Sequence, residues 1–367
     1  MNEEILKKKL EERKAQHSFR QLRLPKKGII DFCSNDYLGI VKNNLLHVEA
    51  GNYSYGATGS RLLTGNYSLV EETEAFIASF HQSESAIIFN SGYDANVGLL
   101  SCVPQKGDTV LYDSLSHASI RDGIRLSFAE SYSFRHNDLD DLDNKLKKAK
   151  GNVFVVTESV FSMDGDKCPL AALVKLCDNY GAYLIIDEAH ATGIIGDKGE
   201  GLVQQFGLQD KVFARVYTFG KACGVHGASV VGSRLLRDYL VNFARSFVYT
   251  TALPGQAIAL IRASYELFPG LVEAREKLWR IVETFNDHCL RLDLQVLKSD
   301  TPIQGVIIPG NERVRRVADQ LQAAGLDSRP ILYPTVPRDQ ERLRIVLHAF
   351  NTEKEVNQLL NCLKNSL

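Results

Sequence analysis

Two residues of this chain, Lys221 and Asp187, could together carry covalent chemistry. Lys221 lies among small residues in the segment 218–224, where an ammonium group loses its proton more easily and the amine can attack a carbonyl. Asp187 follows the apolar run 183–186 and could keep a heteroaromatic nitrogen protonated. Pyridoxal 5'-phosphate needs these two anchors, a Schiff-base amine and an acidic partner for its pyridinium nitrogen. The pair therefore predicts an enzyme that uses this cofactor.

Both residues also have ordinary interpretations. A lysine beside glycines is usually a solvated loop residue. Around Lys221, however, the Thr218 hydroxyl could bind a phosphate oxygen, and Gly220 and Gly224 permit a close approach of the backbone. Asp187 could be a helix N-cap or part of a structural ion pair, although an acidic side chain at the end of an apolar strand is costly to bury without a partner. The combination favours the chemical interpretation.

Two histidines are candidates for contacts with a flat cofactor. His190 follows Asp187 by three residues and could reach the phenolic oxygen of the cofactor. His117 follows an expected strand, and its ring could stack on the cofactor and donate to a substrate carbonyl. A single histidine is more often structural, but Asp-x-x-His at the tip of a strand is a moderately specific pattern.

A phosphate could bind where the apolar run 86–89 leads through glycine into a helix. The backbone amides of Gly92 and Tyr93 would lie at the start of that helix, where unsatisfied donors and the helix dipole favour an anion. Such a turn occurs in every α/β unit and is weak evidence alone. The chain has neither Gly-x-Gly-x-x-Gly nor Gly-x-x-x-x-Gly-Lys-Ser/Thr, which disfavours nicotinamide dinucleotides and P-loop nucleotide hydrolysis.

Composition narrows the class of protein. The 367 residues carry a formal net charge of -1, with 44% hydrophobic and 24% charged residues, as expected for a globular protein that binds neither nucleic acid nor an anionic membrane. No apolar run approaches the roughly 20 residues of a membrane span. The N-terminus lacks the apolar core of a secretion signal. Seven scattered cysteines without Cys-x-x-Cys indicate reduced thiols in the cytoplasm and no metal site.

The elements that must position these residues alternate between short apolar runs and helical patterns from about residue 55 to 250. Runs rich in β-branched residues predict buried strands of a mostly parallel sheet with helices on both faces, which is an α/β fold. Ligands bind at the carboxyl ends of strands in such sheets. Asp187, His190, Ser162 and Lys221 all fall just after expected strands. The expected strands are 86–89, 109–112, 153–156, 183–186 and 229–231.

Three regions are expected along the chain. Residues 1–50 hold a charged helix within the first twenty residues and a short strand at 29–33. Residues 51–255 form a large cofactor-binding domain. Residues 256–367 form a smaller C-terminal α+β domain that ends in a helix opened by a capping box of Thr352 and Glu355. A similar box of Ser68 and Glu71 is expected to open a helix at 68–81.

Ordered motifs over nearly the whole chain resemble those of the α-oxoamine synthases, a family of fold type I pyridoxal-phosphate enzymes. The resemblance predicts the fold of that class, a homodimer, and a decarboxylative condensation of an amino acid with an acyl thioester. The motifs are Cys33-Ser34-Asn35-Asp36-Tyr37-Leu38-Gly39, Gly59-Ser60-Arg61-Leu62, Ser116-His117-Ala118-Ser119, the segment 157–166, the segment 187–193, the Lys221 motif, and Pro334-Thr335-Val336-Pro337.

The resemblance also implies roles for residues. Lys221 would bind the cofactor covalently, Asp187 would pair with the ring nitrogen and His190 would contact the phenolic oxygen. His117 would stack on the ring, with Ser162 nearby. It implies that Gly92, Tyr93 and Thr218 contact the phosphate, and that Thr250 or Thr251 contacts the phosphate of the neighbouring subunit. It also implies that Arg344 binds the amino-acid carboxylate and that Arg20 and Thr335 contact the acyl substrate.

Within the family, segments 59–62 and 218–221 are similar to the branch that condenses L-alanine with a pimeloyl thioester and releases CO2 and the free thiol carrier. The sequence does not distinguish coenzyme A from acyl carrier protein as the thiol carrier, and it does not determine the length of the acyl chain. Residues 40–56 form a shorter segment than in most relatives, and His226 stands where a small residue is usual. Competing interpretations are a glycine C-acetyltransferase, another acyl chain-length specialist, a non-catalytic partner subunit, and a dinucleotide-dependent oxidoreductase.

Overall fold

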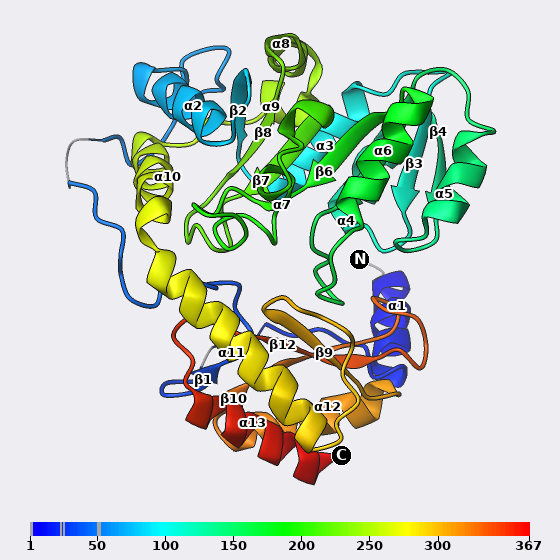
Figure 1. Cartoon of the computed structure of the whole chain (residues 1–367), viewed down its shortest axis with the longest axis vertical. Coiled ribbons are helices and arrows are strands. Elements are labelled where there is room, and N and C mark those ends of the chain that lie inside the picture. Colours follow the sequence, from blue (N-terminus) through cyan, green and yellow to red (C-terminus); the bar gives the residue numbers. More distant parts are fainter. Residues whose placement is uncertain (1–2, 23, 25, 50–52) are drawn as a thin grey trace. The chain divides into compact units, whose positions relative to one another are not determined.

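The computed structural model describes residues 3–22, 24, 26–49 and 53–367, and its chain divides into two compact units (Figure 1). The large unit comprises Leu38–Ser162 and Lys167–Glu273. The small unit comprises Met1–Tyr37, Met163–Asp166 and Ala274–Leu367. The expected boundary between residues 50 and 51 lies outside the described residues. No helix within the described residues is long and apolar enough to cross a membrane.

A seven-stranded sheet forms the centre of the large unit, in the order β2-β8-β7-β6-β5-β3-β4. The five strands from β4 to β7 are parallel, while β8 runs antiparallel to both β7 and β2. The expected mostly parallel sheet is confirmed. The strands are β2 (Ser85–Phe89), β3 (Thr109–Asp113), β4 (Glu130–Phe134), β5 (Val153–Glu158), β6 (Tyr183–Asp187), β7 (Ala214–Thr218) and β8 (Ala228–Gly232).

Helices cover both faces of this sheet, as expected (Figure 1). One face packs against α3, α4, α8 and α9 through a core that includes Leu99, Ile120, Phe154 and Val216. The helices are α2 (Ser68–Phe80), α3 (Gly92–Cys102), α4 (Ala118–Leu126), α5 (Leu139–Leu146), α6 (Leu170–Tyr180), α7 (Leu202–Gln205), α8 (Arg234–Phe243), α9 (Arg245–Val248) and α10 (Gly255–Leu267), with short 3-10 turns at Gln209–Lys211 and Phe268–Gly270.

The expected capping box at the start of α2 is wrong. Ser68 is already the first helical residue, and the N-cap is Tyr67, whose side chain makes no capping hydrogen bond. Glu71 instead accepts a hydrogen bond from Asn66 Nδ2 at 2.8 Å. The box of Thr352 and Glu355 is confirmed, with both reciprocal hydrogen bonds present at the start of α13 (Glu353–Ser366).

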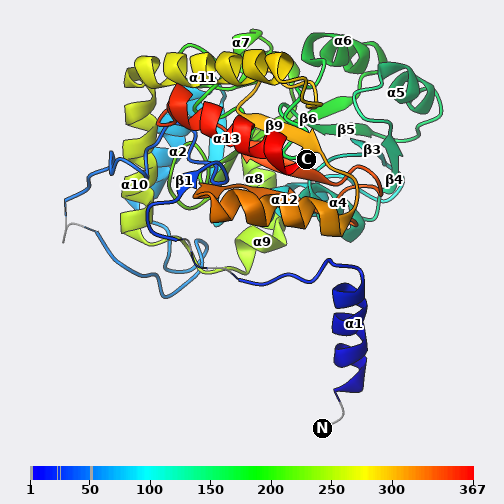
Figure 2. The ribbon, with the colours of Figure 1, turned by 90° about the horizontal axis from the view of Figure 1, so that it is seen from below.

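The small unit is an α+β structure. Its three-stranded antiparallel sheet has the order β11-β12-β9, and β1 (Ile30–Asp31) pairs in parallel with β10 (Leu326–Asp327). Helices α12 and α13 lie side by side in this unit (Figure 2). Its remaining elements are α1 (Glu4–Ala15), α11 (Val272–Arg291), β9 (Ile303–Ile307), α12 (Asn311–Ala323), β11 (Arg329–Ile331) and β12 (Arg342–Val346).

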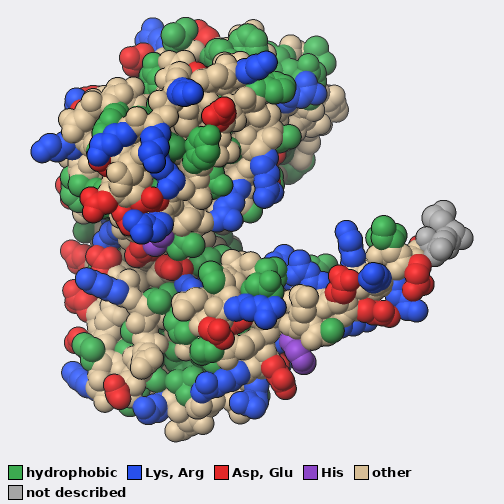
Figure 3. All heavy atoms as spheres, turned by 90° about the vertical axis from the view of Figure 1, so that its right-hand side faces the viewer, with side chains coloured by type: hydrophobic (Ala, Val, Ile, Leu, Met, Phe, Trp, Pro, Cys, Tyr) green, Lys and Arg blue, Asp and Glu red, His purple; other side chains and the backbone are tan. Residues whose placement is uncertain are grey.

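Helix α1 extends away from the other helices of the small unit (Figure 2), and none of its residues is buried. Basic and acidic side chains both lie along its surface (Figure 3). Because no residue of α1 is buried, this helix gains little from packing and depends mainly on its own backbone hydrogen bonds.

Candidate active site

The candidate site forms at the carboxyl ends of β5, β6 and β7 in the large unit. Glu158, the last residue of β5, is the Cα partner of Asp187, the last residue of β6. Thr218 ends the neighbouring strand β7, and Lys221 follows it by three residues. Because parallel strands end at one edge of the sheet, three segments of the chain bring these four residues to that edge.

Asp187 is the buried acid of this edge, with only 6% of its surface exposed. Its Oδ2 accepts a hydrogen bond from Asn96 Nδ2 at 2.8 Å, and its Oδ1 accepts from the backbone N–H of Ala189 at 2.9 Å. Both oxygens therefore accept from N–H donors, which fix the orientation of the carboxyl group at the end of β6. His190, three residues later, is also buried.

His117 forms the N-cap of α4 and is held at several atoms. Its backbone N–H donates to Glu158 Oε1 at 2.7 Å, and its Nδ1 accepts from the backbone N–H of Ser119 at 3.2 Å. The side chain keeps an exposed surface, yet the protein atoms packed around it lower the pKa of the imidazole, while Asp187 acts in the opposite direction. An exposed imidazole face at the strand ends suits stacking on a flat ring.

The charge of Lys221 reaches this cluster. Its ammonium group lowers the pKa values of both His117 and Glu158. Burial, together with the Asp187 carboxylate, raises the pKa of Glu158 to about 8 in spite of Lys221. The cluster thus holds two carboxyl groups, one imidazole and one amine.

The expected phosphate residues also meet. An added Cβ on Gly92, the first residue of α3, would lie only 2.2 Å from Thr218 Oγ1, so the threonine hydroxyl lies directly against the glycine. The phenol of Tyr93 bonds the Asp122 carboxylate and leaves only its backbone for a ligand role. A helix start, a glycine and a hydroxyl supply donors of the kind that bind a phosphate.

Thr250 and Thr251 lie near the same turn of the chain. Asn90 Nδ2 donates to Thr250 Oγ1 at 2.9 Å and to the Thr251 carbonyl at 3.0 Å. Ser162 lies four residues beyond the end of β5 and is partly exposed. The strand ends and these turns fit pyridoxal phosphate, because they combine an amine, a buried carboxylate, and a glycine and a hydroxyl at the start of a helix.

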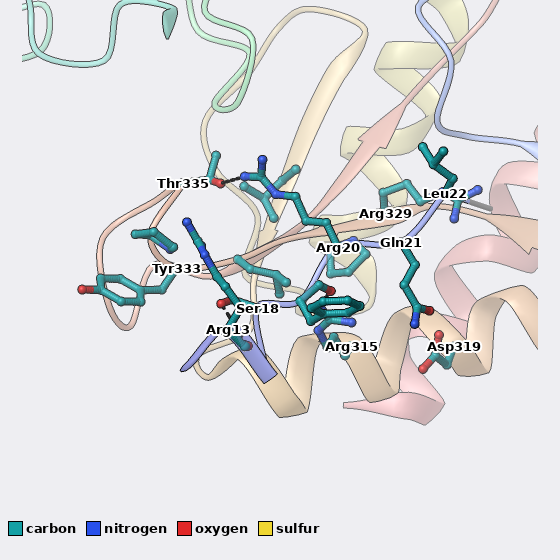
Figure 4. Close-up of a pocket in the computed structure, with 15 residues that line it drawn as sticks. Arg13, Ser18, Arg20, Gln21, Leu22, Arg315, Asp319, Arg329, Tyr333 and Thr335 are labelled. Atoms are coloured by element: carbon teal, nitrogen blue, oxygen red, sulfur yellow. Dashed lines mark hydrogen bonds between the residues drawn. The ribbon is translucent and has the colours of Figure 1, made fainter. Parts of the chain in front are cut away.

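The expected substrate residues belong to the small unit. Arg344 in β12 donates from Nη2 to Asn35 Oδ1 at 3.1 Å, and the same oxygen accepts from the Tyr37 hydroxyl at 3.3 Å. Arg20 and Thr335 are brought together, with Arg20 Nη2 donating to Thr335 Oγ1 at 3.2 Å. They line a pocket of about 660 Å³ that also contains Arg13, Arg315, Asp319 and Arg329 (Figure 4).

Three residues of the site were not expected from the sequence. Asn96 bonds Asp187 and Ser119. Ser119 and Glu158 each bond His117. Glu158 ends an apolar strand just as Asp187 does, so an acidic residue after an apolar run could have identified it from the sequence. Asn96 is a polar residue on the buried side of α3, which the sequence alone does not connect with Asp187.

Comparison with known proteins agrees with this geometry. The family model described as "Aminotransferase class I and II" matches residues 27–363. The 8-amino-7-oxononanoate synthase of Emericella nidulans is 41% identical over 373 residues, covering 93% of this chain and 90% of the relative. The Pseudomonas putida protein of the same name is 40% identical over 340 residues, covering 91% and 87%.

Solved structures give the same result. The 8-amino-7-oxononanoate synthase of Francisella tularensis has a TM-score of 0.77 at 29% identity, covering 93% of this chain and 98% of that one. Serine palmitoyltransferase of Sphingomonas wittichii has a TM-score of 0.86 at 29% identity, covering 92% and 87%. The chain therefore belongs to the aminotransferase class I and II family and, within its fold type I pyridoxal-phosphate enzymes, to the α-oxoamine synthases.

Proposed function

We propose that this chain is an acyltransferase that condenses L-alanine with a pimeloyl thioester to give 8-amino-7-oxononanoate, CO2 and the free thiol carrier, a step of biotin biosynthesis. The observation that carries the proposal is that Lys221, Asp187 and His117 follow the carboxyl ends of β7, β6 and β3, at one edge of the same sheet. Relatives that are 40% and 41% identical over nearly the whole chain bear the corresponding name, which supports the choice of reaction.

Bound pyridoxal phosphate supplies an electron-withdrawing ring that stabilises negative charge on the Cα of the amino acid. Lys221 Nζ is assigned as its covalent anchor and, once released, as the base that takes the Cα proton. The Asp187 carboxylate holds the proton on the ring nitrogen. His190 contacts the phenolic oxygen, and the exposed face of His117 packs on the ring.

The remaining cofactor contacts are assigned from the turns beside the strand ends. The backbone amides of Gly92 and Tyr93 and the hydroxyl of Thr218 bind the phosphate, and Ser162 lies at the ring. Thr250 or Thr251 reaches the phosphate of the partner subunit in a homodimer. Sedimentation of the purified protein tests the dimer, and a monomer at micromolar concentration would contradict it.

Substrate contacts are assigned to the small unit. The Arg344 guanidinium, oriented by Asn35, binds the carboxylate of L-alanine as a fork of donors. Arg20 and Thr335 contact the acyl substrate. Cytoplasmic location is proposed because none of the seven cysteines, all of which the structure describes, forms a disulfide.

A substrate panel tests the reaction. Purified enzyme loaded with cofactor is assayed with alanine or glycine against acetyl and pimeloyl thioesters, each on coenzyme A and on acyl carrier protein. We expect turnover with alanine and the pimeloyl donors. Preference for glycine with acetyl-coenzyme A would replace the proposal with a glycine C-acetyltransferase.

A spectroscopic measurement distinguishes this enzyme from a non-catalytic subunit and from an oxidoreductase. The loaded protein should show a visible Schiff-base absorption that borohydride removes. A protein that binds no cofactor would be a partner subunit, and one that binds nicotinamide instead would be an oxidoreductase.

A further inference from the structure

A continuous chain of hydrogen bonds connects the ring of His117 to the Asp187 carboxylate. The Nδ1 atom of His117 lies 2.8 Å from Ser119 Oγ. Ser119 Oγ accepts from Asn96 Nδ2 at 3.0 Å, and the same amide nitrogen donates to Asp187 Oδ2 at 2.8 Å. Asn96 and Ser119 have 2% and 1% of their surfaces exposed, so water cannot readily replace either bond.

The directions of these bonds follow from the chemistry of the groups. An amide has two N–H donors on its nitrogen, which Asn96 uses for Asp187 and Ser119. The opposite amide orientation would place an amide oxygen against a carboxylate, which is repulsive. Ser119 Oγ therefore accepts from Asn96, and its single proton is free to point at His117 Nδ1.

The Nδ1 atom of His117 must then be an acceptor. It faces the hydroxyl of Ser119 and also accepts from the Ser119 backbone N–H at 3.2 Å. A proton on Nδ1 would point at that N–H. A neutral imidazole that accepts at Nδ1 carries its proton on Nε2, because the bond at one ring nitrogen determines the state of the other.

Two further observations agree with a neutral, fixed ring. The surrounding protein atoms lower the pKa of His117, which favours the uncharged imidazole. Glu158 accepts from the His117 backbone N–H at 2.7 Å and so fixes the main chain from which the ring projects.

We propose that Asn96 and Ser119 are positioning residues that hold His117 as a neutral imidazole with its proton on Nε2 and connect that tautomer to the Asp187 carboxylate. The Nε2–H is then always ready to donate to a substrate carbonyl. This use of the proton rests on the proposed function, whereas the tautomer itself does not depend on which substrates the enzyme accepts.

Nitrogen NMR tests the tautomer directly. Long-range proton–nitrogen correlation is recorded on holoenzyme labelled with 15N-histidine, and the His117 signals are identified by their loss in His117→Gln. We expect the pattern of a neutral ring protonated at Nε2. A ring protonated at Nδ1 would overturn the proposal, even if the substrate panel supports the reaction.

Variants test the two positioning residues. In Ser119→Ala and Asn96→Leu we expect both neutral tautomers of His117, because the hydroxyl is lost or is no longer oriented by the amide. Retention of the pure Nε2–H pattern in both variants would mean that the Ser119 backbone alone controls the ring, and would also overturn the proposal.

Kinetics provide a second readout. Ser119→Ala should lower kcat about tenfold, the equivalent of one hydrogen bond, with little change in the KM for alanine. Ser119→Thr, which restores the hydroxyl, should recover most of kcat. Ser229→Ala is the matched control, because it removes a fully buried hydroxyl from β8, and both kcat and the NMR pattern should stay unchanged. Equal kcat losses in Ser119→Ala and Ser119→Thr would contradict the role of the hydroxyl.

Discussion

In the proposed reaction, Lys221 combines two tasks at one nitrogen atom, covalent attachment of the cofactor and removal of a proton. Replacing it with alanine should remove both, so we expect Lys221→Ala to lose at least about 10⁴-fold in kcat, the upper range of general-base catalysis. The visible absorption of the Schiff base should also disappear. Near-normal turnover by this variant would refute the assignment of Lys221.

A matched control is available at the surface. Lys211 forms an exposed ion pair with Asp178 at 2.8 Å. Lys211→Ala should leave both the turnover and the absorption spectrum unchanged, because exposed pairs of this kind contribute little to stability.

Glu158 makes the stability of the protein depend on pH. Its pKa rises from 4.5 to about 8 on folding, through burial and the neighbouring Asp187 carboxylate. Between these values the folded protein holds a proton that the unfolded chain has released. The free energy of unfolding therefore decreases as the pH rises from about 4.5 to about 8.

Glu158→Gln should weaken this dependence, because glutamine stays neutral and can still accept from the His117 N–H. Urea unfolding at about pH 5 and about pH 8 should show the variant gaining stability relative to the unsubstituted protein at the higher pH. Glu266→Gln, at an exposed carboxylate paired with Arg262, is the control and should show no such trend. A constant difference for Glu158→Gln would contradict the raised pKa.

At the scale of elements, the start of α3 packs directly against the end of β7. A Cβ on Gly92 would lie 2.2 Å from Thr218 Oγ1, so one of the two residues must move. We expect Gly92→Ala to lower the affinity for pyridoxal phosphate about tenfold and to cost about 1–3 kcal/mol of stability, as overpacking commonly does. Equilibrium titration with the cofactor and urea unfolding measure the two effects.

Gly270→Ala serves as the control for that substitution, because an added Cβ there meets nothing within 4 Å. Its cofactor affinity should match that of the unsubstituted protein. Equal affinities for Gly92→Ala and Gly270→Ala would mean that the phosphate does not use the start of α3.

Elements with a strong local pattern were predictable. The expected strands at 109–112, 153–156 and 183–186 correspond to β3, β5 and β6, because apolar β-branched runs have few other stable conformations. β4 and β7 were missed. In β4 only Phe134 is buried, as befits an edge strand, and β7 contains a buried Arg215 whose partners include the Tyr217 hydroxyl. Neither segment shows an apolar run.

At the scale of the whole molecule, the proposed cofactor contacts all belong to the large unit and the proposed substrate contacts Arg20, Thr335 and Arg344 to the small unit. Cofactor binding should therefore stabilise the large unit. A ligand present at 100 times its Kd adds about 2.7 kcal/mol to the stability of the state that binds it.

Removal of the cofactor tests this expectation. Holoenzyme stripped with hydroxylamine should show a lower Tm in calorimetry, and added pyridoxal phosphate should restore it. If two transitions are resolved, the one that shifts is expected to be that of the large unit. An identical Tm with and without cofactor would contradict a site within that unit.

The amino-acid sequence alone specifies the order of the elements and the chemical residues at their ends. Asp187 and His117 could be identified because each stands in a short motif after an apolar run, and Lys221 because of the small residues in its own motif. These signals are all local in the chain. Which groups touch became known only from the folded molecule. Asn96 and Asp187 are 91 positions apart, and the contact of Glu158 with His117 spans 41. Such contacts depend on strand order and register, which arise when the whole sheet packs and leave no trace in a local pattern.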